Sequence, residues 1–329
     1  MKVGFSQGQV TIKSLGDAQE RRIPFASVEG ISVFGMAQLS TRLVRECIAS
    51  GVRITYYSDD GHYFGSTSSS EHINPARQKR QIYLTDDDAF CLEWSSRVVE
   101  AKIRNSLALL RSFSGLCELT EEDVRGLQHS LDSLHYAETV DMVLGFEGNA
   151  AKAYFKCLSK AVQPEEMRFC GRSTRPPKDP FNSMLSFGYS ILYRNVIGAI
   201  ERHGLHPYFA FMHKLKLGHA ALASDIVEDL RAPLVDRIVL EFVNAGEVGP
   251  DDFEPNAAGA IYMKRETMRR LTRQFTRVMV KGLPFFAAYG DDKSYGFQVM
   301  LDKKLGSAMA AIEKGDASLY KPFVWDPES

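Results

Sequence analysis

A change in hydrophobic periodicity near residue 85 constrains this fold more than any other feature of the sequence. Before it, apolar and polar residues alternate in five short segments, at 9–13, 22–25, 30–34, 52–57 and 62–66. After it, apolar residues recur at helical spacing in six longer segments, at 86–113, 119–160, 181–203, 218–245, 257–282 and 291–314. Alternation is typical of half-buried strands, and the longer period is typical of amphipathic helices. Since strands and helices are segregated along the chain, the pattern predicts separate domains.

These patterns predict an α+β multidomain protein with a small β-sandwich-like N-terminal domain and a larger all-α domain. The expected divisions are a β-rich domain at 1–75, a linker at 76–85 and a helical domain at 86–329. One helix is expected inside the β-rich domain, beginning at Ser40 or Thr41 and ending at Gly51. A hairpin turn is expected at 59–61, where the sequence reads Asp-Asp-Gly.

Composition excludes several classes of protein. The chain has 329 residues and a formal net charge of −1, so no global basic excess indicates nucleic-acid binding, although local clusters still can. Its five cysteines are scattered and never spaced as Cys-x-x-Cys, which disfavours a zinc site or a disulfide framework. We expect no signal peptide and no membrane span, because no apolar run of the required length occurs. These features predict a cytoplasmic protein.

Three acids and one histidine form the most informative chemical pattern. Asp225 and Glu228 lie at i and i+3 on a predicted helix, so their carboxylates can face the same point. They follow His213 by twelve and fifteen residues. Glu147 lies in another predicted helix, where it shares a face with two alanines and Tyr154. Carboxylate oxygens with one imidazole suit Mg²⁺ or Mn²⁺.

Taken singly, each of these residues also has an ordinary structural interpretation. Glu147 fits a surface acid beside an alanine-rich packing face, and the other two acids fit a solvated helix face. His213 fits a core histidine with satisfied hydrogen bonds. His203 and His219 lie nearby in the sequence, and spacing alone does not choose among the three histidines.

A first basic segment surrounds a rigid Pro-Pro pair at 176–177. Arg172, Arg175 and Lys178 flank the pair, and Asp179 or Asn182 then begins an apolar helix. An extended backbone that carries arginines suits phosphate contact. A basic loop between helices with no ligand explains the segment equally well.

A second basic segment lies on the helix predicted over 257–282. Its basic residues recur at every fourth position: Arg265, Arg269, Arg273, Arg277 and Lys281. Like charges at this spacing disfavour an isolated helix by a few tenths of a kcal/mol per pair, roughly. A polyanion lying along the stripe would offset that cost, and a plain solvated face usually mixes charge signs. We therefore expect the stripe to bind DNA.

Together, these motifs resemble the CRISPR-associated protein one family over nearly the whole chain. The resemblance is carried by four ordered motifs and a closing segment: Glu147 with Ala150, Ala151 and Tyr154; Arg175, Pro176, Pro177, Asp179 and Asn182; Gly204, Leu205, Pro207, Tyr208 and His213; Asp225, Glu228, Arg231 and Pro233; and Tyr-Lys-Pro-Phe-Val-Trp at 320–325. The sequence departs from the family pattern at His206, Ala210 and His219, where the family has Asp, Gly and Arg. None of these departures falls on an expected catalytic position.

The resemblance implies a β-rich domain used for dimerisation and a helical catalytic domain. It implies that Glu147, His213 and Asp225 bind Mg²⁺ or Mn²⁺ and that Glu228 occupies a fourth, more variable acidic position in catalysis. Tyr154 and Asn182 are expected to support the site.

The implied activity is a DNA integrase and endonuclease of CRISPR adaptation. Such an enzyme inserts new spacers into the repeat array by metal-dependent transesterification and also cleaves DNA. The implied partners are a double-stranded spacer precursor, the CRISPR repeat, a second copy of the chain, and CRISPR-associated protein two bridging two dimers. The alternatives are a non-catalytic DNA-binding scaffold and a hydrolytic nuclease acting on branched repair intermediates.

Overall fold

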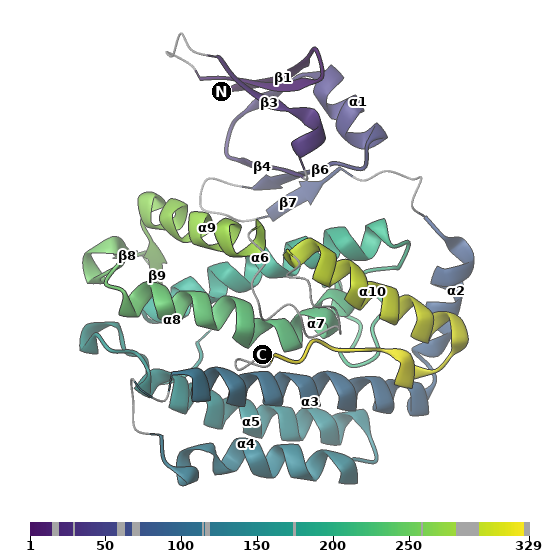
Figure 1. Cartoon of the computed structure of the whole chain (residues 1–329), viewed down its shortest axis with the longest axis vertical. Coiled ribbons are helices and arrows are strands. Elements are labelled where there is room, and N and C mark those ends of the chain that lie inside the picture. The colour runs from purple at the N-terminus through teal and green to yellow at the C-terminus, as the bar shows by residue number, and fades with distance from the viewer. Residues whose placement is uncertain are drawn as a thin grey trace. The chain divides into compact units, whose positions relative to one another are not determined.

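The computed structural model divides the chain into two compact units, Met1–Ile73 and Asn74–Ser329 (Figure 1). The structure describes residues 1–14, 20–28, 30–57, 63–67, 73–113, 115, 119–173, 176–257, 259–280 and 296–325. Each unit has its own buried core. The order of a β-rich N-terminal region and a mostly helical remainder confirms the fold class predicted from periodicity.

The first unit contains two small sheets. Its strands are β1 (Lys2–Ser6), β2 (Gln9–Lys13), β3 (Glu20–Pro24), β4 (Gly30–Phe34), β5 (Gln38–Leu39), β6 (Arg53–Tyr57) and β7 (Tyr63–Ser66). One sheet has the order β3-β2-β1-β5 and the other the order β4-β6-β7. Strands β1 to β3 are antiparallel neighbours, whereas β1 with β5 and β4 with β6 are parallel. The predicted turn at 59–61 lies outside the described residues, although the antiparallel pairing of β6 with β7 agrees with a hairpin.

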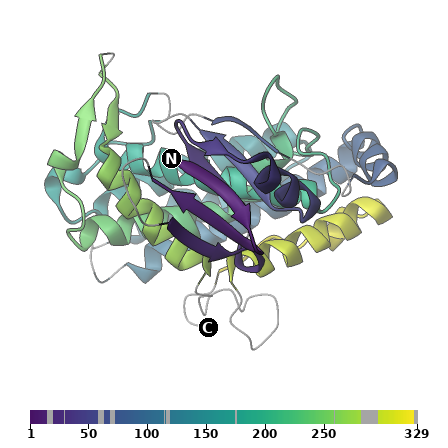
Figure 2. The same ribbon diagram turned by 90° about the horizontal axis from the view of Figure 1, so that it is seen from above.

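Helix α1 (Thr41–Ala49) lies beside these strands (Figure 2). The Ser40 hydroxyl accepts a hydrogen bond from the Leu43 amide at 3.2 Å, which identifies Ser40 as the cap. The backbone of Gly51 has φ 69°, a left-handed conformation that glycine adopts without strain. Leu43 and Cys47 of α1 are fully buried and pack with Ile54 in the core of this unit.

The second unit is built from helices. The longer ones are α2 (Pro75–Leu84), α3 (Asp88–Ser112), α4 (Glu121–Ser133), α5 (Val140–Lys160), α6 (Pro180–Arg202), α9 (Arg265–Val280) and α10 (Phe297–Lys314). The shorter elements are α7 (Ala221–Val227), α8 (Arg237–Asn244) and a hairpin of β8 (Phe253–Pro255) and β9 (Ile261–Met263). None of the described helices combines the length and apolar character needed to span a bilayer.

The predicted linker at 76–85 is wrong, because α2 occupies these residues. The Asn74 side chain accepts a hydrogen bond from the Arg77 amide at 3.0 Å and caps the helix, and Pro75 stands in its first turn. Proline fits that position because its missing N–H has no helical partner there. Gln81 is fully buried and donates to the carbonyls of His206 and Phe209 at 2.8 and 2.6 Å. Helix α2 is therefore packed into the helical core.

Helix α3 forms the centre of this core. Trp94 has no exposed surface and stacks on Tyr320 with ring centroids 3.8 Å apart. Asn105 holds the C-terminal strap, residues 320–325, through its side-chain amide: it donates to the Phe323 carbonyl at 2.8 Å and accepts from the Trp325 amide at 2.7 Å. In Figure 1 this strap runs alongside α3.

The helix that begins at α7 changes its winding before α8. A 3-10 turn, η5 (Glu228–Leu230), and a π-helical turn, η6 (Arg231–Asp236), separate the two α-helices. Pro233 lies in η6 and has no N–H to donate to a preceding carbonyl. The Asp229 carbonyl instead accepts from the Asn105 side chain at 2.5 Å. The irregular turn therefore has a cause in the sequence, and it sets the directions of the side chains from 228 to 236.

Candidate active site

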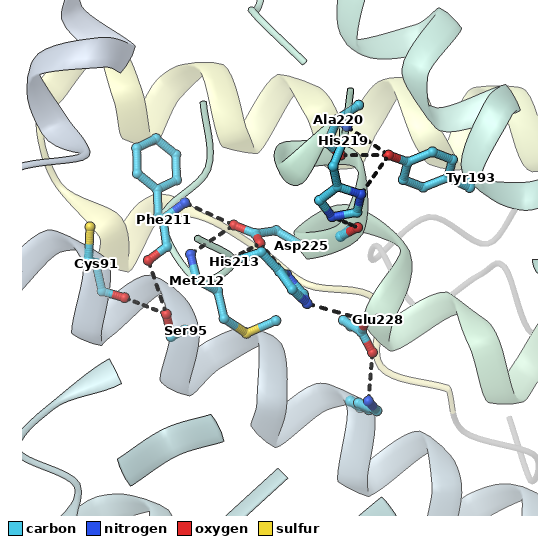
Figure 3. A network of polar contacts seen from close by, with 12 residues as sticks. Cys91, Ser95, Tyr193, Phe211, Met212, His213, His219, Ala220, Asp225 and Glu228 are labelled. Carbon is cyan, nitrogen blue, oxygen red and sulfur yellow. Dashed lines mark hydrogen bonds and ion pairs between the residues drawn. The ribbon is translucent and has the colours of Figure 1, made fainter. Parts of the chain in front are cut away.

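Asp225 holds the segment before His213 in place. This carboxylate is fully buried and accepts hydrogen bonds from the amides of Phe211, Met212 and His213 at 3.0, 3.1 and 3.1 Å (Figure 3). Its Oδ1 also lies 2.8 Å from His213 Nδ1. Burial alone would lower the pKa of His213, but hydrogen bonding to Asp225 and the charges of Asp225 and Glu228 raise it. Both oxygens of Asp225 are thus engaged within the protein.

Glu228 approaches the other edge of the same imidazole ring. Its Oε1 lies 4.0 Å from His213 Nε2 and 2.8 Å from an Arg231 guanidinium nitrogen, and its Oε2 accepts from Lys102 at 2.6 Å. Burial would raise the pKa of Glu228, but the cations Arg231 and Lys102 outweigh it and lower the pKa to about 2. Glu228 is consequently ionised at neutral pH although only 4% of its side chain is exposed.

Glu147 reaches the same place from α5. Its carboxylate pairs with the Lys102 ammonium, which also bonds Glu228. Lys102 lies on α3, so this one cation joins α3, α5 and η5. The structure therefore brings together Glu147, His213 and Glu228, which the sequence placed on three separate segments.

A small pocket of about 30 Å³ opens beside these residues, large enough for a bound water. Among its lining residues are Tyr154, Tyr189 and Asp236. The two tyrosine hydroxyls donate to Asp236 at 2.7 and 2.5 Å. Burial raises the pKa of Asp236 to about 6, despite these two hydrogen bonds and the nearby arginines. Tyr154 thus lines this pocket and orients a buried carboxyl group.

The geometry also chooses among the histidines. His219 Nε2 lies 3.1 Å from the Ser224 hydroxyl, and its ring stacks near Tyr193 (Figure 3). His203 Nδ1 lies 2.8 Å from the Ala199 carbonyl on its own helix. Of the three, His213 is the one whose free ring edge faces Glu228.

The first basic segment is only partly directed outward. Arg172 bonds the side chains of Asn182 and Ser186 at 2.8 and 3.0 Å, and its guanidinium lies 5.3 Å from the Tyr189 ring centroid. Lys178 is exposed, whereas Arg175 lies outside the described residues. Asn182 is fully buried and accepts from the Ser173 amide at 3.1 Å. It therefore fixes this loop against α6.

The basic stripe lies on α9, as expected. Its described members, Arg265, Arg269, Arg273 and Arg277, are exposed, and Lys281 lies outside the described residues. Glu266 pairs with two of them, Arg269 and Arg273, at 3.4 and 3.5 Å. Phe275 anchors the opposite face, and a Cβ placed on Gly188 of α6 would come within 2.6 Å of its ring. The stripe is thus seated on α6 by a close helix contact.

Sequence reasoning missed Lys102 and the pairing of Arg231. Lys102 falls between apolar residues, but Ser95 and Ser106 recur with it at helical spacing and signal a polar stripe on a buried helix. Arg231 follows Glu228 at i+3, a spacing that favours contact on one side of a helix, and its guanidinium lies 2.8 Å from that carboxylate.

The oxygen and nitrogen donors around Lys102 are of the types that bind a hard divalent cation. Two carboxylates and one imidazole are available, and the lysine ammonium already stands between the carboxylates as a cation. Within the described ranges, no three His, Cys, Asp or Glu side chains are gathered closely enough to enclose a metal ion in this arrangement. The residues therefore fit Mg²⁺ or Mn²⁺ in type, with Lys102 occupying the place between them.

Comparisons with known proteins agree on one family. The family described as CRISPR associated protein Cas1 matches residues 1–277. A CRISPR-associated endonuclease Cas1 of Mycobacterium tuberculosis is 40% identical over 320 residues, covering 96% of this chain and 93% of that protein. A second relative with this description, from Chlorobaculum tepidum, is 29% identical over 329 residues, covering 97% of this chain and 94% of that protein.

Solved structures show the same fold. A Cas1 protein from Thermotoga maritima matches with a TM-score of 0.80 at 18% identity, covering 100% of this chain and 97% of that one. A casposase bound to an integration product matches with a TM-score of 0.82 at 23% identity, covering 98% and 91%.

The two-unit fold and the family match define the class of CRISPR-associated proteins. The chain belongs to the CRISPR associated protein Cas1 family. This membership confirms the resemblance found in the sequence motifs.

Proposed function

We propose that this chain is a divalent-metal-dependent integrase that joins new spacers to the CRISPR repeat by transesterification and also cleaves DNA. The observation that carries the proposal is the convergence on Lys102. Its ammonium bonds both Glu147 and Glu228, and His213 Nε2 lies 4.0 Å from Glu228. Two acids and an imidazole from three elements thus meet at a point where positive charge is stabilised.

The geometry supports a ligand set different from the one expected from the motifs. We assign Glu147, His213 and Glu228 to the metal, because one ammonium bonds both acids and His213 Nε2 lies 4.0 Å from Glu228. Asp225 was expected to be a direct ligand, but its oxygens accept three amides and contact His213 Nδ1. It acts as a positioning residue that directs the Nε2 edge of His213 toward Glu228, as outer carboxylates do at many metal sites.

When bound, Mg²⁺ or Mn²⁺ would polarise a phosphodiester and stabilise charge on its leaving oxygen. The protein's own residues prepare the place for this. Arg231 keeps Glu228 ionised through a 2.8 Å ion pair, and Asp225 fixes the tautomer of His213. A 3′-hydroxyl as the acceptor gives strand joining, whereas water as the acceptor gives cleavage.

The partners follow from charge and from the relatives. The arginines of α9 suit the phosphate backbone of the spacer precursor and the repeat. One structural relative is a casposase bound to an integration product, and another belongs to a Cas6-RT-Cas1–Cas2 complex. These relatives support DNA and CRISPR-associated protein two as partners. The homodimer is proposed from the family resemblance of the motifs.

The test is integration of a labelled duplex with 3′-hydroxyl ends into repeat DNA, with Mn²⁺ and with a chelator. We expect activity only with the metal and a loss of at least 100-fold in Glu147→Ala, His213→Ala and Glu228→Ala, about 3 kcal/mol of transition-state stabilisation. Asp141→Asn is the control, because Asp141 is exposed and pairs with Lys214 at 3.1 Å. DNA binding that is unaffected by the chelator, with no strand joining under either condition, would support the scaffold alternative, and products from water alone would support the hydrolytic nuclease.

A further inference from the structure

Lys102 occupies the centre of the proposed metal site as a fixed positive charge. Only 17% of its side chain is exposed, compared with 23% for Glu147 and 4% for Glu228. Its ammonium is 2.6 Å from Glu228 and also bonds Glu147. Most surface lysines extend into water, where an ion pair contributes little. Lys102 instead lies between two carboxylates that are proposed to bind the metal, so its position needs a functional explanation.

The two carboxylates already bond one ammonium ion. Oxygens around Mg²⁺ lie at about 2.0 to 2.1 Å, whereas Glu228 Oε2 lies 2.6 Å from Lys102 Nζ. A dication between the same oxygens would also meet the lysine charge at close range, at low local dielectric. Ammonium and metal therefore compete for the same acceptors.

Arg231 does not compete in this way. It pairs with Oε1 of Glu228, whereas Lys102 bonds Oε2. The Arg231 guanidinium also lies 4.9 Å from the Tyr189 ring centroid, a second contact that Lys102 does not share. Arg231 can stay in place while Lys102 leaves.

We propose that Lys102 is the internal counter-ion of the metal-free site and that metal binding is a cation exchange. The lysine keeps Glu147 and Glu228 together before the metal arrives, and it leaves both carboxylates when Mg²⁺ or Mn²⁺ binds. Metal affinity is therefore set by the cost of expelling this ammonium as well as by the ligands. This inference rests on the proposed metal site.

The first test is binding of Mn²⁺ alone to the purified full chain, measured by calorimetry. We expect Lys102→Met to bind Mn²⁺ on the order of tenfold more tightly than the wild type, equal to about 1.4 kcal/mol. Its unfolding temperature in chelator should fall, because the carboxylates lose their counter-ion. Lys102→Arg keeps the charge and should bind no more tightly than the wild type.

The matched control is Lys160→Met. Lys160 pairs with Asp123 at 2.6 Å and also lies on α5, about 20 Å along the helix from Glu147. Its loss removes an ammonium–carboxylate pair of the same chemistry without touching the site. Mn²⁺ affinity should not change.

A second measurement uses the wild type, in case Lys102→Met does not fold. The rate of Lys102 acetylation by an amine-reactive ester is followed by mass spectrometry, with Lys160 in the same chain as internal reference. We expect Mn²⁺ to increase labelling of Lys102 several-fold and to leave labelling of Lys160 unchanged. An unchanged rate at Lys102, or wild-type Mn²⁺ affinity in folded Lys102→Met, would overturn the exchange.

The proposed function fails in a different way. If Mn²⁺ does not bind the wild type, or binds Glu147→Gln and His213→Ala as tightly, the metal site itself is wrong and the exchange falls with it. If those two variants weaken binding while Lys102→Met leaves it unchanged, the site stands and only the role of Lys102 is refuted.

Discussion

The Nδ1 atom of His213 lies 2.8 Å from Oδ1 of Asp225, and the same carboxylate accepts the amide of His213 at 3.1 Å. Two contacts to one acid leave the imidazole a single orientation, with Nε2 directed at Glu228. The acid is fully buried, so water does not replace either contact.

This relationship predicts that Asp225→Asn loses activity without losing a metal ligand. The amide places a donor where the backbone needs an acceptor, and His213 loses the partner that fixes its tautomer. We expect strand joining to fall by about 10- to 100-fold. Rates at saturating Mn²⁺ measure the effect, with Asp141→Asn as control. Wild-type rates would show that Asp225 does not position His213.

Glu228 and Asp229 are neighbours with opposite roles. Glu228→Gln should weaken Mn²⁺ binding at least tenfold, about 1.4 kcal/mol, and should destabilise the fold less than the next variant does, because Lys102 keeps Glu147 as a partner. Asp229→Asn removes the carboxylate partner of Lys304. Because Lys304 has no exposed surface, water cannot replace that partner. We expect this variant to lose about 3 to 5 kcal/mol of unfolding free energy. Urea denaturation and Mn²⁺ titration on both variants separate the roles, and equal effects on both would contradict the assignment.

The stripe on α9 predicts a salt-dependent loss of DNA binding. The double variant Arg269→Ala/Arg273→Ala removes two exposed cations, which should lower the slope of log affinity against log salt by about 2. Arg270→Ala is the control, because Arg270 is directed into the fold and pairs with Asp252. It should change stability rather than the salt slope. The same slope for both variants would refute the stripe.

The buried acid Asp236 predicts a stability change with pH. Burial raises its folded pKa to about 6, above the ordinary value of 3.8. Because the folded state binds this proton more tightly, the protonated group stabilises the fold fully when the pH is below the unfolded pKa. This stabilisation is lost as the pH rises through the folded pKa. The wild type should therefore lose about 1 kcal/mol from this group between pH 5 and pH 8.

Asp236→Asn removes this titration while keeping an acceptor for one tyrosine. As the pH rises from 5 to 8, the unfolding free energy of the wild type should fall by about 1 kcal/mol relative to that of the variant. Urea denaturation at pH 5 and pH 8 gives the comparison. A difference that does not vary with pH would show that Asp236 does not titrate in this range.

Local chemistry predicted the elements that depend on neighbours in sequence. Ser40 and Gly51 delimit α1 because a cap and a left-handed glycine act within one turn. Strand β1 was missed although its residues alternate, since Gly4 weakens the signal in a short run. The β8–β9 hairpin was missed because each strand has only three residues, and β9 falls inside the segment predicted as helix at 257–282.

The sequence motifs named the histidine and the acids that lie together, but not the separate contacts that each of them makes. Helical spacing put Asp225 and Glu228 on one side, and both do contact His213. Asp225 is the acid that accepts backbone amides, and these come from a loop about twelve residues earlier. Spacing along one helix does not reveal such contacts. Lys102 was missed for the same reason, since its partners come from α5 and η5.

The strap at 320–325 affects when this site can exist during synthesis. Asp229, next to Glu228, accepts from the Phe323 amide at 2.6 Å, and Asn105 needs Phe323 and Trp325 as backbone partners. Those residues are translated more than ninety positions after Glu228. A chain that is still attached to the ribosome therefore contains the proposed metal-binding residues before it can hold them in their final positions. The complete arrangement around Glu228 forms only after residues 320–325 have been translated.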